Sequence, residues 1–286
     1  MHSRTLKHFL AVAEHLHFGR ASDECHISTS ALSRSIQQLE EELATVLFIR
    51  DNRSVVLTKH GQTFLDYARE ATAQWAVIRN QLSDESGPLH GEISMYCSVT
   101  ASYSILFDLL NEFRQNHPGI EIKLHTGDPE HAIARIVAGQ ENLTIAAHPN
   151  TLLRGVEFKH ITNSPLVFIT SKTGHEVPES AKQWAETPMI LSEGGVARNR
   201  VDAWFKQHQI SPQIYAQVAG NEAIVSMVSL GLGIGVVPQI VIDHSPMADR
   251  IKILDVQPKL EPYNIGLLTL KKNLQNPLIK AFWGLL

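Results

Sequence analysis

The sequence predicts an α/β protein in two parts: a small helical part that ends in a β-hairpin, and a larger part of alternating strands and helices. Residues 4–58 show three short amphipathic helical patterns followed by two extended runs. Residues 60–83 carry a heptad pattern, and from residue 92 onward strand-like and helical patterns alternate, which is typical of an α/β sheet. The length of 286 residues also exceeds that of one usual domain.

The first part is predicted to be a winged helix-turn-helix over residues 1–58. Its first helix lies around Phe9, its second runs from about Gly19 to Cys25, and its third follows Ser28, a good N-cap residue. The third helix carries an apolar stripe at helical spacing, made of Leu32, Ile36, Leu39 and Leu43. Two extended runs, 47–50 and 54–57, flank a polar turn and therefore predict a wing.

The polar face of the third helix and the wing hold the candidate DNA contacts. Short or planar hydrogen-bonding side chains suit base edges and phosphates. The candidates are Thr29, Ser30, Ser33, Arg34, Gln37, Arg50 and Arg53. Residues 1–60 contain seven basic and seven acidic side chains, so the placement of the charges, and not their sum, favours DNA binding. The acidic run from Glu40 to Glu42 is expected to face away from the duplex. For Arg34, the alternative is a surface salt bridge with an acid one turn away.

Residues 59–84 are predicted to form a long linker helix. Its apolar residues are spaced 4, 3, 4, 3 and 4 apart, which are heptad a and d positions. They are Phe64, Ala68, Ala71, Trp75, Ile78 and Leu82. The pattern favours a coiled-coil dimer helix, and an ordinary amphipathic helix packed on its own chain is the alternative.

A polar segment rich in Gly and Pro predicts a hinge at residues 85–90, followed by a two-lobed α/β domain over residues 91–286. Two series of strand and helix patterns predict two parallel sheets. The last strand and helix are left over, and in a two-lobed receptor such a tail returns to complete the first lobe. Lobe I is therefore expected at 91–160 and 266–286, and lobe II at 161–265, with a binding cleft between them.

The strand ends that face this cleft hold the candidate ligand contacts. Ser98, Thr100 and Ser102 lie between a strand and a helix expected to begin near Tyr103, where free backbone N–H groups and hydroxyls bind anions. Simple helix capping is the alternative for these hydroxyls. The other candidates follow predicted strands and could be turn formers only: Gly127, Asp128, His148, Ser192, Gly194 and Asn221.

Several other classes of protein are disfavoured. The glycines at 231–235 follow a helix and precede a strand, the reverse of the order in a dinucleotide-binding motif. The 15 histidines show no metal-ligand spacing, and no catalytic constellation stands out, so we expect no metal, no cofactor and no enzyme activity. Cys25 and Cys97 suggest no disulfide framework, and neither a signal peptide nor an apolar run of roughly 18 residues is present. A cytoplasmic location is expected, and an α/β enzyme with an accessory winged helix is the rival class.

Residues 18–58 contain the block Ala31-Leu32-Ser33-Arg34, the motif Leu47-Phe48-x-Arg50 and the pair Leu57-Thr58. Through these residues the segment closely resembles the LysR-type transcriptional regulators. Departures at Thr29, Ser30 and Ala44 bear only on site preference. The remainder is similar to the family's effector domain, which resembles the periplasmic binding protein fold, through Phe113-x-x-x-x-Pro118 and the run 231–238. The resemblance implies a homodimer or homotetramer that binds double-stranded operator DNA and acts with RNA polymerase.

Several segments look more narrowly like family members that regulate branched-chain amino-acid biosynthesis. These segments are DNRSVVLT, CSVTASYS, EIKLHTGD, EAIVSMVSLGLGIGVVP and PLIKAFW. The likeness implies an activator of acetohydroxyacid isomeroreductase expression that responds to acetolactate or acetohydroxybutyrate. It also places Thr100 at the family's effector-contacting position. A family member that responds to another small carboxylate is the alternative.

Overall fold

The computed structural model describes residues 2–51, 54–82 and 88–286. The chain divides into two units: an N-terminal unit of residues 1–87 with 138–140, and a C-terminal unit of residues 88–137 and 141–286. In the part of the chain that is described, no helix has the length and apolar character needed to cross a membrane.

The N-terminal unit is a winged helix-turn-helix, as predicted. It contains α1 (Ser3–His15), α2 (Phe18–Glu24), α3 (Thr29–Glu42), an antiparallel hairpin of β1 (Phe48–Arg50) and β2 (Val55–Leu57), and α4 (Lys59–Leu82). The Ser28 side chain caps α3 by accepting a hydrogen bond from the Ala31 N–H. Phe9 lies at the centre of the apolar core, with its ring 5.1 Å from that of Phe48 and 4.7 Å from that of Phe64.

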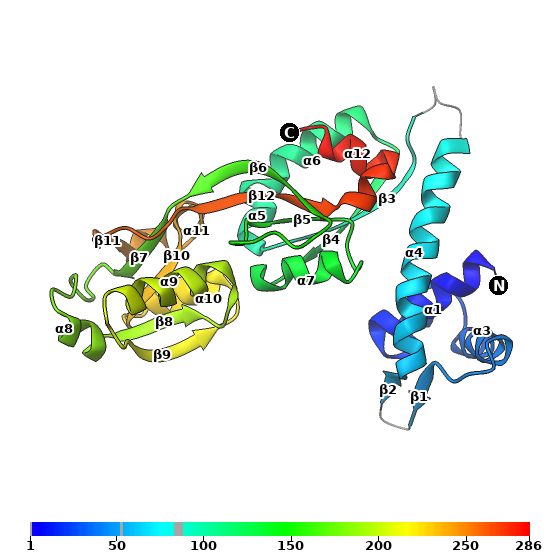
Figure 1. The fold of residues 1–286 in the computed structure, drawn as a ribbon, viewed down its shortest axis with the longest axis horizontal. Coiled ribbons are helices and arrows are strands. Elements are labelled where there is room, and N and C mark those ends of the chain that lie inside the picture. Colours follow the sequence, from blue (N-terminus) through cyan, green and yellow to red (C-terminus); the bar gives the residue numbers. More distant parts are fainter. Residues whose placement is uncertain (1, 52–53, 83–87) are drawn as a thin grey trace. The chain divides into compact units, whose positions relative to one another are not determined.

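Helix α4 has two different halves (Figure 1). Its first half packs on the N-terminal core, where Ala68 is fully buried and Phe64 and Ala71 are partly buried. Farther along, the heptad residues are exposed: Trp75 at 58%, Ile78 at 47% and Leu82 at 82%. The first half of the predicted apolar stripe is therefore part of the chain's own core. Only the heptad residues from Trp75 onward are exposed to solvent.

The first lobe of the C-terminal unit is a five-stranded sheet in the order β4-β3-β5-β12-β6. Strands β3 (Gly91–Cys97), β4 (Ile120–Thr126) and β5 (Leu143–Ala147) are parallel, whereas β12 (Tyr263–Leu270) and β6 (Val156–Ser164) are antiparallel to their neighbours. The helical segments of this lobe are α5 (Val99–Ser104), α6 (Leu106–Asn116), η1 (Pro129–His131), α7 (Ala132–Val137), η3 (Lys271–Gln275) and α12 (Pro277–Trp283).

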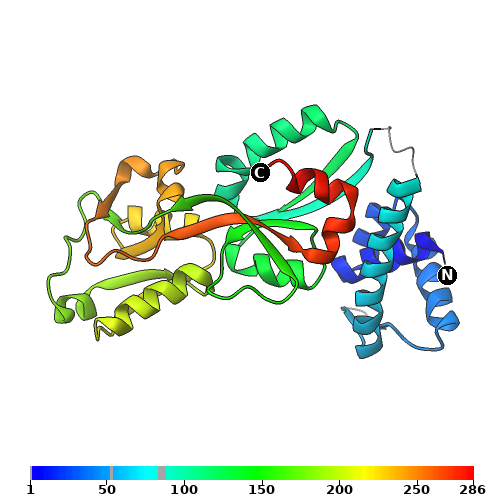
Figure 2. The ribbon, with the colours of Figure 1, turned by 45° about the horizontal axis from the view of Figure 1, so that its top comes forward.

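The second lobe has the sheet order β11-β7-β10-β8-β9. Its strands are β7 (Leu166–Ser171), β8 (Pro188–Ser192), β9 (Gln213–Val218), β10 (Ile234–Pro238) and β11 (Ile251–Leu254). Its helical segments are α8 (Ala181–Glu186), α9 (Gly195–Gln207), α10 (Asn221–Ser229), α11 (Gln239–Asp243) and η2 (Ala248–Arg250). β6 and β12 run side by side as long strands at the passage between the lobes (Figures 1 and 2).

The tail returns to the first lobe as predicted, but four details differ from the sequence pattern. Both sheets are mixed rather than parallel, because the returning strands are antiparallel. The helix expected near Tyr103 begins at Val99 and is interrupted at Ile105. β6, α11 and β11 are not among the predicted elements; β6 is an edge strand with mostly polar residues, so its apolar pattern is weak. β6 continues to Ser164 and β12 starts at Tyr263, so the lobe I sheet extends a few residues past the expected limits of 160 and 266.

Candidate functional site

The exposed face of α3 is the candidate nucleic-acid surface. Leu32, Ile36 and Leu39 fix the helix to the core, which turns its polar residues outward. Arg34 is exposed; its Nε donates to the Ser30 carbonyl at 3.4 Å, and it forms no ion pair with any residue in the described ranges. The salt-bridge alternative for Arg34 is therefore not seen, and its guanidinium is available to a phosphate or a base.

The other predicted residues of α3 each have a local partner. Ser33 is half-buried and accepts from the Arg50 guanidinium at 3.1 Å. The Thr29 hydroxyl lies 3.0 Å from that of Ser22 and joins α3 to α2, and the exposed Gln37 amide donates to Glu41. The Ser30 hydroxyl lies 3.1 Å from that of Ser28. All of these bonds stay within the helix-turn-helix and wing surface.

Arg50 has a structural partner that the sequence did not reveal. Oε1 of Glu40 accepts hydrogen bonds from the backbone N–H groups of Leu47 (2.8 Å) and Phe48 (3.1 Å), and its Oε2 lies 3.1 Å from Arg50. Only 15% of the Glu40 side chain is exposed, so it is not part of a solvated acidic run but fixes the start of the wing. Arg50 also lies over the Phe18 ring, 4.5 Å from its centroid. Arg53 lies outside the described residues.

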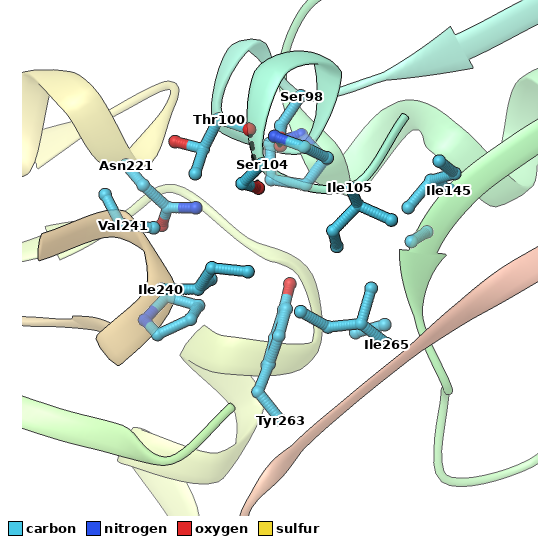
Figure 3. A pocket seen from close by; sticks show the side chains of 15 residues that line it. Ser98, Thr100, Ser104, Ile105, Ile145, Asn221, Ile240, Val241, Tyr263 and Ile265 are labelled. Atoms are coloured by element: carbon cyan, nitrogen blue, oxygen red, sulfur yellow. Dashed lines mark hydrogen bonds between the residues drawn. The ribbon is translucent and has the colours of Figure 1, made fainter. Parts of the chain in front are cut away.

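A cleft between the two lobes of the C-terminal unit is the candidate ligand site (Figure 3). Its inner part has a volume of about 30 Å³, and an outer part that shares Pro129, Ala147, Asn221 and Tyr263 with it has about 140 Å³. The inner part combines hydroxyl groups with an apolar wall of Ile105, Ile145, Ile240 and Ile265. Among the described lining residues of both parts there is no lysine or arginine, while Asp128 and Glu130 line the outer part.

The hydroxyl groups of the inner cleft come from α5 with its N-cap and from the start of β12. Ser98 caps α5 by accepting from the Ala101 N–H, which positions Thr100 on the first turn. Thr100 is 2% exposed, and both its N–H and its hydroxyl donate to Oε1 of Glu222, at 2.9 and 2.5 Å. Tyr263 at the start of β12 points its hydroxyl into the pocket (Figure 3). Burial raises the pKa of Tyr263 to about 12, so this phenol stays protonated and can donate a hydrogen bond.

A second bond joins the lobes beside the first. The Gly220 N–H donates to Oδ2 of Asp128 at 3.1 Å, and Oδ1 of Asp128 accepts from the Glu130 N–H. Gly220 has φ = 82°, a left-handed conformation that favours glycine. No group of three or more His, Cys, Asp or Glu residues within the described ranges could hold a metal ion.

Comparison with known proteins agrees with this architecture. Residues 3–62 match the family model of the bacterial regulatory helix-turn-helix proteins of the lysR family, and residues 86–286 match the LysR substrate binding domain. The chain belongs to the LysR family. It is 42% identical over 293 residues to the HTH-type transcriptional activator IlvY of Salmonella typhimurium, with 100% of this chain and 99% of the relative covered. The identity to IlvY of Haemophilus influenzae is 43% over 286 residues, which cover 98% of each chain.

Solved LysR-family structures share the fold. Full-length OxyR from Pseudomonas aeruginosa aligns with a TM-score of 0.70 at 19% identity, covering 99% of this chain and 93% of that one. CbnR aligns with a TM-score of 0.65 at 22% identity, covering 99% and 97%. The full-length likeness to transcriptional activators makes this LysR-family chain a transcription regulator and not an enzyme, as the sequence predicted.

The structure brings six of the nine predicted effector residues of this LysR-family cleft together. Ser98, Thr100 and Asn221 line the inner part, and Asp128, Ser192, Gly194 and again Asn221 line the outer part. The other three do not line it. Ser102 lies two residues past Thr100, so it points away on α5 and donates to the Val99 carbonyl. Gly127 packs against the Tyr96 hydroxyl, and the His148 ring packs on Phe158.

Sequence reasoning missed several lining residues. Ser104 could have been found, because it lies four residues after Thr100 and therefore on the same helix face. Tyr263 carried no local signal. Tyr263 enters the cleft only because the chain returns to the first lobe, and Glu222 meets Thr100 across 122 residues of sequence.

Proposed function

We propose that this LysR-family regulator activates expression of the acetohydroxyacid isomeroreductase gene in response to acetolactate or acetohydroxybutyrate. The observation that carries the proposal is the composition of the inner cleft: buried hydroxyl and N–H donors beside an isoleucine wall, with no basic side chain among the described lining residues. The likeness to IlvY activators over the full chain length supports the target gene.

The chemistry of these effectors matches the lining. An acetohydroxyacid has a carboxylate, a hydroxyl and a ketone on one side and short alkyl groups on the other. We expect Thr100 and Ser98 to bind the oxygen atoms, Tyr263 to donate to one of them, and Ile105 and Ile240 to contact the alkyl groups. We expect the neutral Tyr263 phenol and the Thr100 N–H to donate to an oxygen anion without a buried lysine.

For the N-terminal unit, we propose that α3 and the wing contact a double-stranded operator. The exposed Trp75, Ile78 and Leu82 then pair two chains, which assemble as a dimer or tetramer. Activation implies contact with RNA polymerase in the cytoplasm. Protection of DNA upstream of the isomeroreductase gene from nuclease digestion tests the operator assignment.

Calorimetry of the full chain tests the effector. Acetolactate and acetohydroxybutyrate should both bind, and Tyr263→Phe should weaken binding by about 1–3 kcal/mol, because a ligand oxygen loses its donor. Ser102→Ala is the matched control: its hydroxyl faces away from the cleft, so binding should not change. The other candidate is a different hydroxylated carboxylate, since the effector domain of QuiR, with a TM-score of 0.59 and 22% identity, was solved with shikimate. Heat with shikimate and none with either acetohydroxyacid would overturn the effector assignment.

A further inference from the structure

The N–H and hydroxyl donors of Thr100, in the first turn of α5, are already bonded to a carboxylate of the chain itself. One oxygen of Glu222 accepts both the N–H and the hydroxyl of Thr100, at 2.9 and 2.5 Å. Thr100 is 2% exposed, so these donors cannot turn to water instead. Glu222 belongs to the first turn of α10 in lobe II, whereas Thr100 belongs to lobe I.

The neighbouring residues strengthen this contact between the lobes. Gly220 donates its N–H to Asp128, so the segment that starts α10 is bonded to the ends of both β3 and β4. The left-handed φ of 82° at Gly220 lets the chain turn so that Glu222 and Asn221 both face lobe I. The inner cleft, which Thr100 lines, has about 30 Å³, room for roughly two water molecules.

We propose that Glu222 is an internal competitor of the effector: its carboxylate occupies the place of the effector carboxylate and holds the lobes together until the effector displaces it. The inference rests on the proposed function, that a small carboxylate binds at Thr100. Two carboxylates cannot share the same two donors, because like charges at this distance repel and no lysine or arginine in the described lining neutralises them.

Because of this competition, the effector binds the two conformations with different affinity, which a ligand-driven switch requires. In the closed form, Glu222 bonds to Thr100. In the bound form the effector takes these donors, Glu222 is released, and the bond between the lobes is exchanged for bonds to the ligand. Glu222 thereby sets how much effector is needed to trigger the change.

Removing the competing carboxylate from the full-length chain tests the inference. Glu222→Ala should tighten acetolactate binding by about tenfold in calorimetry, because the effector no longer has to break a charge-assisted hydrogen bond. Glu222→Gln, which keeps an acceptor but no charge, should give a smaller gain. Glu186→Gln is the matched control, an exposed lobe II carboxylate whose partner is Lys182. Unchanged or weaker binding of acetolactate by Glu222→Ala would show that Glu222 does not compete.

A measurement without ligand separates the two proposals. Deuterium exchange of the peptide that contains Thr100 should rise in Glu222→Ala and not in Glu186→Gln, because the Thr100 N–H loses its acceptor. Unchanged exchange overturns the internal contact whatever the effector is. Raised exchange in a protein that binds neither acetohydroxyacid supports the contact and removes only the effector assignment.

Discussion

The two candidate sites of this regulator differ in where their polar groups find partners. On α3, the exposed Arg34 and Gln37 bond only within their own helix. In the cleft, buried Thr100 bonds to Glu222 of the other lobe, and Asp128 bonds to Gly220 in the same way. The candidate DNA surface thus presents Arg34 and Gln37 outward, whereas the candidate effector cleft has Thr100 and Asp128 paired across the two lobes.

This difference predicts how substitutions behave. A residue on the outward surface can be changed with little effect on folding, and its loss appears in binding to another molecule. A residue in the cleft is part of an internal bond, so its loss alters the equilibrium between conformations as well as the affinity for a ligand.

The largest effect is expected at the exposed end of α4. Trp75 is 58% exposed in one chain, and we expect a second chain to cover it. Trp75→Glu should place an unpaired charge in that interface at a cost of roughly 3–5 kcal/mol. The variant should sediment as a smaller species and bind DNA weakly, whereas Gln74→Glu, on an adjacent exposed position, should not. A variant that keeps the wild-type oligomer would place the dimer contact elsewhere.

The next largest effect is expected at Glu40, which lies on α3 but is mostly buried and hydrogen-bonded to the wing. Glu40→Ala leaves the N–H groups of Leu47 and Phe48 and the Arg50 guanidinium without their acceptor, so unfolding free energy should fall by about 3 kcal/mol. Binding to every DNA sequence should weaken together, because the wing loses its anchor. Glu41→Ala removes an exposed neighbour and should leave stability nearly unchanged, as chemical denaturation can show.

Arg34 tests the outward face directly. Arg34→Ala should weaken operator binding by about 1–3 kcal/mol and relax preference at one base pair, with no change in unfolding free energy. Competition between operator and unrelated DNA at fixed salt measures both. Equal losses on operator and unrelated DNA would mean that Arg34 contacts a phosphate, and no loss would remove α3 from the DNA face.

The smallest effect is expected for the pH dependence of stability, through His8, which contacts Ser35 of α3. His8 is buried, and its Nδ1 lies 2.8 Å from the Ser35 hydroxyl. Burial, with a smaller contribution from Arg4, lowers the pKa of His8 below its ordinary value of 6.5. The unfolded chain therefore takes up a proton before the folded chain does as the pH falls below 6.5, so stability of the N-terminal unit should decrease there. Calorimetric melting at about pH 7.5 and about pH 5.5 should show a smaller decrease for His8→Gln. An equal decrease would assign it to other groups.

The sequence by itself determined the features that depend on local periodicity. The apolar stripe of Leu32, Ile36 and Leu39 predicted both the burial of one face of α3 and the exposure of Arg34 on the other, because helical geometry fixes which residues share a face. At Ser98 the sequence offered helix capping as the alternative to ligand binding, and Ser98 does cap α5, although this helix begins earlier than the expected position near Tyr103.

Only the tertiary structure decided which groups meet over long sequence distances. The sequence placed Glu40 in an acidic run that faces away from the duplex, but the path of the chain into the wing pairs its carboxylate with the N–H groups of Leu47 and Phe48. Likewise, Tyr263 reaches the cleft because the chain returns to lobe I, and Glu222 meets Thr100 because the segment before α10 turns at Gly220. Such meetings depend on chain crossovers and strand register, which no short-range residue pattern encodes.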